Sequence, residues 1–166
     1  MKRESYLALA AWFNARPAAK RGLRAVSAGS VALVYLLYGG LLGWLLLRHD
    51  PRFGRVLAVP AAIFLLGTAL RAALNRPRPY EALGFAPLFP KDTAGKSMPS
   101  RHAFCAAGIA AAAWYVAPAL GAAGAVLALA VAASRVLAGV HYPADVLAGL
   151  ALGAALGALG FLLPFG

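Results

Sequence analysis

Long apolar stretches alternate with short polar segments along most of the chain. A helix needs about 20 predominantly apolar residues to cross a bilayer, and five stretches approach this length, the third being short. Most of the charged residues gather between or before these stretches. The pattern predicts an all-α protein, a polytopic membrane helical bundle with about five transmembrane helices, as a single domain over residues 1–166. The expected spans are Val26–Leu47, Val56–Leu74, Ala103–Val116, Ala119–Val140 and Val146–Leu163.

The N-terminal segment, residues 1–24, has a different pattern. Its apolar run, Tyr6–Phe13, is too short to span a membrane and has basic residues on both sides. A signal peptide would have a cleavage site of small residues after its apolar run, whereas here Arg16 and Lys20 follow the run. We therefore expect residues 1–24 to form an amphipathic interfacial helix whose basic face contacts anionic lipid headgroups.

Composition agrees with a membrane protein and narrows the possible partners. Hydrophobic residues make up 62% of the chain and charged residues only 13%, which excludes an ordinary soluble domain. The net charge of +11 would suit nucleic acid, but the basic residues do not lie on a soluble module that could dock a duplex. We expect an anionic lipid bilayer as partner and no nucleic acid. The single cysteine, Cys105, excludes an internal disulfide, and the oligomeric state is left open.

Glycines recur at four-residue spacing in two of the expected spans. Gly149, Gly153 and Gly157 follow this spacing in the last span, and Gly39 and Gly43 follow it in the first. Small residues at this spacing allow the backbones of membrane helices to approach closely. The spacing predicts helix packing at both sets.

Three polar clusters interrupt the spans and carry the candidate chemistry. An alternating path through the membrane places all three on the same side, and ionisable groups gathered at one membrane depth indicate a functional site because each is costly there. The clusters read RAALNRPRPYE at the end of the second span, PSRHAF at the start of the third, and SRVLAGVHYPAD between the fourth and fifth.

Taken singly, several of these residues have a structural explanation. Arg71 and Arg135 end helices, where the helix dipole favours any cation, and Ser100 is a plausible N-cap. This explanation does not account for two histidines, His102 and His141, at the same depth as the arginines.

The residue types favour a bound phosphate. Arginine presents a planar fork of donors that matches phosphate oxygens, and a helix N-terminus adds free N–H groups. Four arginines would repel a cation, and no carboxylate cluster offers a ligand set, so we predict neither a metal nor a cofactor. Two histidines beside a phosphate suggest chemistry, since imidazole acts as nucleophile or acid near neutral pH.

The three clusters together resemble the signature of the type 2 phosphatidic acid phosphatase superfamily. These enzymes remove phosphate from lipids and share their phosphate pocket with vanadate-dependent haloperoxidases. The matching motifs cover residues 71–145: Arg71, six residues, Arg78-Pro79; Pro99-Ser100-Arg101-His102; and Ser134-Arg135, five residues, His141, three residues, Asp145.

The chain departs from this signature at two positions. The first motif usually opens with lysine, where this chain has Arg71, which keeps the charge but changes its reach. The second motif usually has glycine where this chain has Arg101. The backbone N–H at that position is retained, whereas the added side chain alters the rim of the pocket and leaves the accepted headgroup open.

The resemblance implies a metal-independent phosphatase mechanism through a phosphohistidine. His141 would attack phosphorus, Asp145 would hold the other ring nitrogen, and His102 would protonate the departing alkoxide. The residues implied to bind the phosphate oxygens are Arg71, Arg78, Ser100, Arg101 and Arg135.

The lipid substrate is left open by the sequence. Phosphatidic acid, phosphatidylglycerol phosphate and polyprenyl phosphates or diphosphates all present a suitable phosphate. A non-catalytic lipid-phosphate binder or carrier with the same pocket is the alternative function. The segment Tyr80–Met98, with Phe85, Leu88 and Phe89, is either an apolar rim or lid for a lipid tail or a plain surface loop.

The expected location is the cell membrane, but two arguments disagree about which side the motifs face. Outside the motif residues, nine basic residues lie on the motif side and three on the other, which indicates a cytoplasmic site by the positive-inside rule. The family resemblance implies an extracytoplasmic site.

Overall fold

The protein is described by a computed structural model that covers residues 1–91 and 93–163. All regular secondary structure in these residues is helical. The elements are α1 (Arg3–Asn14), α2 (Pro17–Leu47), α3 (Phe53–Leu74), α4 (Pro79–Ala82), α5 (Arg101–Val116), α6 (Pro118–Leu137) and α7 (Pro143–Leu162).

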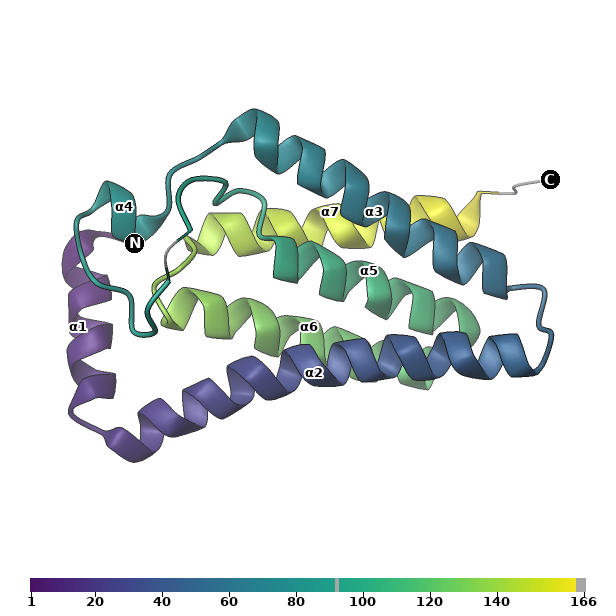
Figure 1. Ribbon diagram of the computed structural model, residues 1–166, viewed down its shortest axis with the longest axis horizontal. Coiled ribbons are helices and arrows are strands. Elements are labelled where there is room, and N and C mark those ends of the chain that lie inside the picture. Colours follow the sequence, from purple (N-terminus) through teal and green to yellow (C-terminus); the bar gives the residue numbers. More distant parts are fainter. Residues whose placement is uncertain (92, 164–166) are drawn as a thin grey trace.

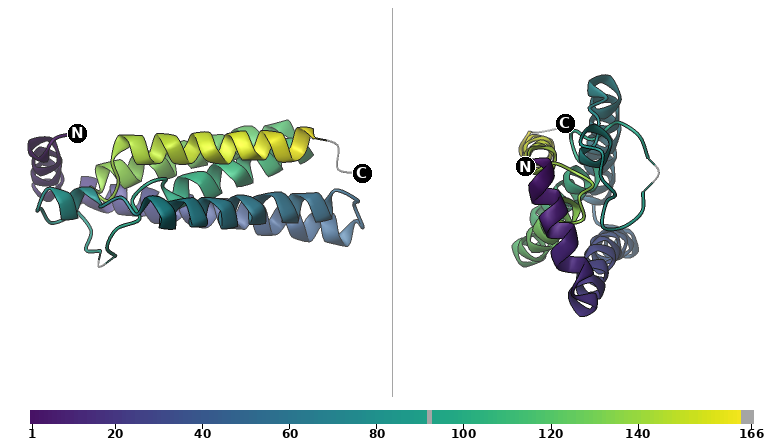
Figure 2. Two further views of the ribbon diagram at one scale, coloured as in Figure 1. Left: turned by 90° about the horizontal axis from the view of Figure 1, so that it is seen from above. Right: turned by 90° about the vertical axis from the view of Figure 1, so that its left-hand side faces the viewer.

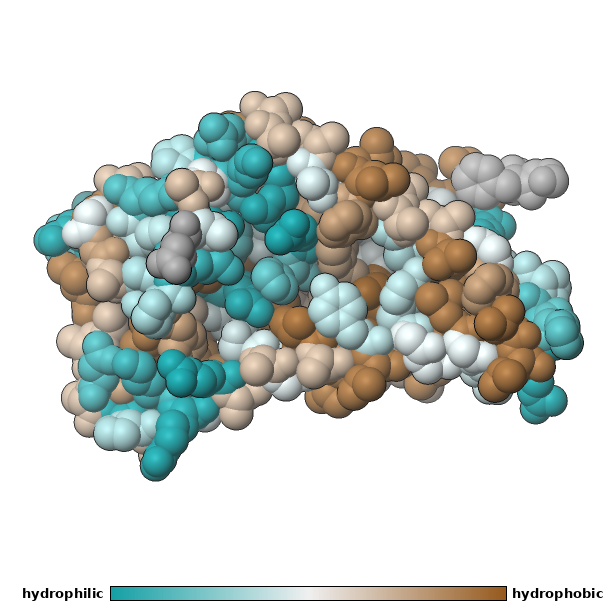
Figure 3. Space-filling view, in the orientation of Figure 1, coloured by the Kyte–Doolittle hydropathy of each residue, from teal (hydrophilic) through white to brown (hydrophobic). Residues whose placement is uncertain are grey.

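α2, α3, α5, α6 and α7 run side by side, and the short α1 and α4 lie together at one end of the bundle (Figure 1). The end-on view shows α1 lying across that end (Figure 2). Hydrophilic patches gather toward this end, among apolar ones, and at the tip of the α2–α3 turn, with apolar surface over much of the bundle between them (Figure 3). The predicted helical membrane bundle is confirmed.

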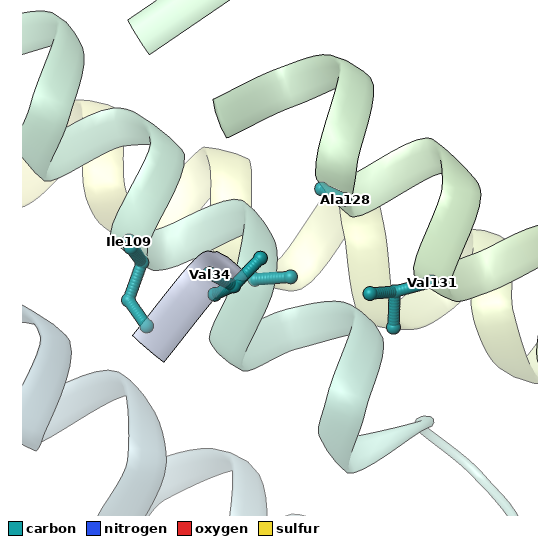
Figure 4. Close-up of a cluster of buried hydrophobic side chains, with 5 residues drawn as sticks. Val34, Ile109, Ala128 and Val131 are labelled. Atoms are coloured by element: carbon teal, nitrogen blue, oxygen red, sulfur yellow. The ribbon is translucent and has the colours of Figure 1, made fainter. Parts of the chain in front are cut away.

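The third predicted span, α5, forms the centre of the bundle. It packs against α2, α3, α6 and α7, and most of its buried residues are alanine or glycine. Small side chains allow the helices to approach closely. In lipid, where the hydrophobic effect does not drive helices together, this close van der Waals packing holds the bundle together. One of the clusters around α5 joins Val34, Ile109, Ala128 and Val131 (Figure 4).

The central helix α5 is shorter than the helices that surround it. Four helical segments, which contain α2, α3, α6 and α7, are long and apolar enough to cross a membrane among the described residues. At 16 residues, α5 is shorter than these, and it starts at the depth of the polar clusters.

The N-terminal segment is divided where one interfacial helix was expected. The first helix ends at Asn14, and α2 begins at Pro17, so residues 17–24 extend the first span instead of joining α1. Pro17 explains the break, because proline is favoured in the first turn of a new helix and disrupts the interior of an existing one. Tyr6 and Phe13 are the buried residues of α1.

The two glycine sets behave differently. A Cβ at Gly149 would lie 2.7 Å from the carbonyl oxygen of Ser100, and one at Gly157 would lie 2.6 Å from the Ala111 side chain. The packing prediction is therefore confirmed for α7. It is wrong for Gly39 and Gly43, where an added Cβ meets nothing within 4 Å.

Candidate active site

The three polar clusters meet at the end of the bundle that carries α1 and α4 (Figure 1). Local sequence explains each turn there. Asn75 ends α3 in the left-handed conformation that asparagine tolerates, and Gly139 takes a φ of 75° after α6. Pro143 then starts α7. The predicted residues lie as follows: Arg71 in the last turn of α3, Arg78 just before α4, Ser100, Arg101 and His102 at the start of α5, Arg135 at the end of α6, and His141 and Asp145 around the start of α7.

His141 is buried and its ring lies beside Asp145. The Nδ1 atom of His141 lies 3.6 Å from Oδ2 of Asp145 and 3.4 Å from the Ser97 hydroxyl. The Ser97 hydroxyl donates to the same Asp145 oxygen, and the backbone N–H of Tyr142 donates to it at 2.9 Å. This arrangement holds one edge of the imidazole and leaves Nε2 as the ring nitrogen available for chemistry.

Burial lowers the pKa of His141, and the interaction with Asp145 opposes this by raising it. Nearby Arg78 and Arg71 lower the pKa further. The net shift is downward, so His141 is neutral near pH 7 and its Nε2 lone pair is available.

Two residues of this network were missed by the sequence reasoning. Arg76 donates to Oδ1 of Asp145 at 2.9 Å, and its guanidinium lies 4.6 Å from the centre of the Tyr142 ring. Arg76 lies within the first motif but is not one of the motif's matching positions. Ser97 precedes the second motif by two positions, and its backbone N–H also donates to the Arg76 carbonyl at 2.8 Å. The only signal for either residue was its closeness to a motif.

Arg71 and Arg78 are both buried and are oriented by backbone carbonyl groups. Arg71 donates to the Pro99 carbonyl at 3.3 Å. Arg78 donates through Nε to the Gly95 carbonyl at 3.1 Å and through a terminal nitrogen to the Val140 carbonyl at 3.4 Å. Each guanidinium keeps further N–H groups after these bonds, because arginine carries five.

Two other predicted residues each have a buried polar atom without a hydrogen-bond partner in the described chain. The hydroxyl oxygen of Ser100 and the Nε of Arg135 make no hydrogen bond within the described chain. Buried polar atoms are nearly always satisfied. Unpartnered donors of this kind near Arg71 and Arg78 are suited to an anionic ligand.

The start of α5 is fixed against α7 at the same place. The backbone N–H of Ser100 donates to the Asp145 carbonyl at 2.8 Å. His102 is half-buried and Arg101 is exposed. Both line a cavity of about 290 Å³ between α2, α3, α5 and α6, together with Cys105.

The segment between α4 and α5 is fastened to the N-terminal helices. Leu88 is buried with Phe13 and Leu23, and its N–H donates to the Ala138 carbonyl at 3.1 Å. The Phe85 ring stacks on the Tyr6 ring at 5.1 Å. These side chains therefore anchor the segment against α1, the start of α2 and the end of α6.

Helix α1 also contacts the turn that carries His141. The Tyr6 hydroxyl is buried and donates to the His141 carbonyl at 3.2 Å. Burial raises the pKa of Tyr6 to about 12, with smaller contributions from Tyr142 and Asp145. The hydroxyl consequently keeps its proton and its hydrogen bond across the physiological pH range.

No three His, Cys, Asp or Glu side chains converge within residues 1–91 and 93–163, so this part of the chain offers no metal-ligand cluster.

Comparisons with known proteins agree with this geometry. Residues 27–166 match the PAP2 superfamily, so the chain belongs to that family, and its apolar helices make it a multi-pass membrane protein. A comparison with curated protein sequences finds no match.

Two solved structures share the fold. One is a transmembrane PAP2-type phosphatidylglycerolphosphate phosphatase from Bacillus subtilis, with 27% identity, a TM-score of 0.60, and coverage of 93% of this chain and 90% of the other. The other is LpxE from Aquifex aeolicus, with 24% identity, a TM-score of 0.72, and coverage of 96% and 94%.

Proposed function

We propose that this protein is an integral membrane lipid phosphatase that works through a phosphohistidine on His141. The observation that carries the proposal is a buried group of arginines, with unpartnered polar atoms on Ser100 and Arg135, next to a histidine held by a carboxylate. Family membership and the phosphatase from Bacillus subtilis support the same reaction class.

The proposed first step is in-line attack of His141 Nε2 on phosphorus. A nitrogen–phosphorus bond forms as the bond from phosphorus to the leaving oxygen breaks, and His102 gives its proton to that oxygen. Asp145 holds Nδ1–H and stabilises the positive charge that develops on the ring. The equatorial phosphate oxygens lie against Arg71, Arg78, Ser100, Arg101 and Arg135, where charge stabilisation matters most.

The second step is hydrolysis of the phosphohistidine. Water attacks phosphorus, the nitrogen–phosphorus bond breaks, and inorganic phosphate leaves. His102, unprotonated after the first step, accepts the proton of the attacking water, which returns both histidines to their starting state.

The cavity beside His102 is the proposed place for the part of a lipid tail nearest its phosphate. Its other walls come from Val31, Val34 and Tyr35 of α2, Phe64 of α3, and Val131 of α6. Tyr35 and Phe64 are 58% and 43% exposed, so the cavity opens between α2 and α3 towards the surrounding bilayer. A lipid whose tail lies in this cavity would have its phosphate group next to His102.

The test is phosphate release by purified protein in detergent, with EDTA present, from phosphatidic acid, phosphatidylglycerol phosphate, and polyprenyl mono- and diphosphates. We expect release from at least one lipid, unchanged by EDTA, because the positive charge of the pocket comes from side chains. Tight binding without release would favour the carrier alternative. Activity that EDTA removes and magnesium restores would contradict metal independence.

We propose the cytoplasmic side for the site, on the charge count alone. α1 and the start of α2 lie at the motif end (Figure 1), so the basic residues of the N-terminal segment count with the motifs in the positive-inside comparison. With Cys105→Ser as background, single cysteines at exposed Ala94 and His49 report the two ends of the bundle. An impermeant maleimide applied to intact cells should label the His49 position. Labelling at Ala94 instead would place the site outside.

A further inference from the structure

His141 lies on the turn between α6 and α7, outside both helices. Three carbonyl groups of this turn accept hydrogen bonds from other parts of the chain. These bonds run from the Leu88 N–H to Ala138 at 3.1 Å, from Arg78 to Val140 at 3.4 Å, and from the Tyr6 hydroxyl to His141 at 3.2 Å. The position of the histidine backbone therefore depends on side chains and segments that are remote in sequence.

Tyr6 is the donor that reaches the carbonyl of His141 itself. Its side chain is 2% exposed, and its ring stacks on the Phe85 ring at 5.1 Å and meets the Tyr142 ring edge-on at 6.3 Å. A Cβ added at Gly139 would lie 3.8 Å from the Tyr6 ring. Tyr6 thus contacts this turn through both its hydroxyl and its ring.

Helix α1, which carries Tyr6, is fastened on both sides of it. Towards the N-terminus, Arg3 donates through Nε to the Leu83 carbonyl at 3.0 Å. Towards the C-terminus, Phe13 is buried with Leu23 and Leu88. The helix lies across the end of the bundle (Figure 2), so these contacts hold the Tyr6 hydroxyl at a fixed place over the turn.

The proposed reaction is sensitive to where this turn stands. Most of the residues proposed to bind phosphate lie at the ends of α3, α4 and α5, whereas His141 lies on the α6–α7 turn. In-line attack requires Nε2 within about 3–3.5 Å of phosphorus, in the correct direction. Asp145 and Ser97 set the direction of the ring. The bonds to the backbone of the turn set its distance from the phosphate.

We propose that Tyr6 is a positioning residue for His141. Its hydroxyl holds the histidine backbone at the distance that attack on phosphorus requires, and it acts through that backbone instead of on the substrate. The inference rests on the proposed function and extends the machinery of that reaction to α1, which lies outside the three motifs.

The test variant is Tyr6→Phe, which removes the hydroxyl and keeps the stacked ring. Tyr38→Phe is the matched control. The Tyr38 hydroxyl also donates to a backbone carbonyl, that of Val56 at 3.2 Å, in a part-buried position near the α2–α3 turn. Both variants lose the same kind of bond, but only one of the two bonds is made to the nucleophile.

Tyr6→Phe should lower kcat/KM about tenfold. This lies between the roughly fivefold effect of one neutral hydrogen bond and the roughly hundredfold effect of a displacement of about 1 Å. The factor should be the same for the best lipid substrate and for an activated aryl phosphate, because attack slows whatever group leaves. Tyr38→Phe should change neither rate. A loss confined to the lipid would overturn the inference, because it would place the effect at the protonation step.

Quenched single-turnover reactions separate positioning from a general loss of structure. The amount of labelled protein counts the active molecules, and its rate of appearance measures attack in each of them. Tyr6→Phe should lower the rate constant and keep the amplitude. A lower amplitude with the wild-type rate constant would show that Tyr6 only stabilises the fold.

Nuclear magnetic resonance of the histidine rings needs no turnover. The chain has three histidines, so the ring ¹⁵N signals of His141 are assigned with His49→Ala and His102→Ala. Tyr6→Phe should shift or broaden the His141 signals and leave those of His49 unchanged, and Tyr38→Phe should change neither.

The two readouts distinguish this inference from the proposed function. If wild-type protein releases no phosphate yet Tyr6→Phe alters the His141 signals selectively, the phosphatase proposal fails and the positioning of His141 by Tyr6 stands. If phosphate is released but Tyr6→Phe changes neither the His141 signals nor the rate constant, the positioning role fails and the phosphatase proposal stands.

Discussion

The two ends of the bundle carry the same kinds of polar residue and use them differently. At the α2–α3 turn, Asp50 accepts two side-chain bonds from Arg52, at 2.9 and 2.8 Å. Hydrogen bonding from Arg52 lowers the pKa of Asp50 to about 2. Arg55 donates to the carbonyl groups of Gly160 and Leu163. These charged groups therefore find their hydrogen-bond partners within the protein.

At the motif end, the arginine side chains are more deeply buried, and some polar atoms have no hydrogen-bond partner among the described residues. Arg71 and Arg78 are 7% and 5% exposed, and the polar atoms of Ser100 and Arg135 have no partner in the described chain. A cation that is paired locally stabilises a turn, whereas a buried set of cations without carboxylate partners is suited to an anionic ligand. Arginine content alone would not have separated the two ends.

The largest predicted difference between the two ends is the effect on activity of replacing the histidine that each end carries. His141→Ala should lower lipid phosphatase activity by about a thousandfold or more, because the nucleophile is lost. His49 is exposed on the α2–α3 turn, so His49→Ala should leave the rate unchanged. Phosphate release at saturating lipid measures both, and a fully active His141→Ala protein would refute the assignment of the nucleophile.

Asp145 and Asp50 give the matched comparison for the carboxylates. Asp145→Asn should lower kcat by roughly a hundredfold or more, since the ring loses the group that orients it, while Asp50→Asn at the far end should not change it. A pH profile adds a second readout. Activity requires neutral His141, whose pKa is lowered by burial, so kcat/KM in the wild type should rise with a midpoint below the ordinary histidine value of 6.5.

The direction of the pH shift in Asp145→Asn follows from the same balance. Asp145 raises the pKa of His141 against the effect of burial. Removing the carboxylate lets burial dominate, so the acid limb of the residual activity should move to still lower pH. A limb that moves upward, or does not move, would show that Asp145 does not act on the titrating group.

His102 should show an effect that depends on the leaving group. His102→Ala should slow phosphatidic acid hydrolysis by about a hundredfold, within the usual range for general acid catalysis, and an activated aryl phosphate far less, because that leaving group needs no proton. The ratio of the two rates is the measurement. Equal losses on both substrates would argue against His102 as the acid.

Arg76 should give a smaller effect, by acting through Asp145. Arg76→Gln should lower kcat about tenfold with little change in KM, and Arg76→Lys should recover part of it. Arg52→Gln is the control, because Arg52 holds Asp50 at the other end through the same kind of pair. An increase in KM alone would indicate that Arg76 binds substrate directly.

The apolar pattern was enough to predict the bundle. The predicted spans match α2, α3, α5, α6 and α7 with shifts at their ends, because lipid requires that each backbone satisfy its own hydrogen bonds in a helix. The position of α5 at the centre was not predictable from its composition. Gly39 and Gly43 show the same limit, since the spacing of small residues does not say which face meets a neighbour.

The meeting of the three motif clusters could be predicted, because they end or begin successive spans on the same side of the membrane. Arg76 and Ser97 could not, because each acts through a contact between segments far apart in sequence. Arg76 reaches Asp145 across 69 positions, and Ser97 reaches it across 48. Such contacts depend on how the connecting segment folds over the end of the bundle.

The central claim, that His141 carries phosphate during turnover, is tested most directly by trapping the intermediate. Protein is mixed with phosphatidic acid labelled in its phosphate, quenched in denaturant within one turnover, and digested to locate the label. We predict a label that is stable to base and labile to acid on the peptide containing His141, and absent from His141→Ala. Label on any other residue, or turnover with no labelled protein at any quench time, would contradict the account.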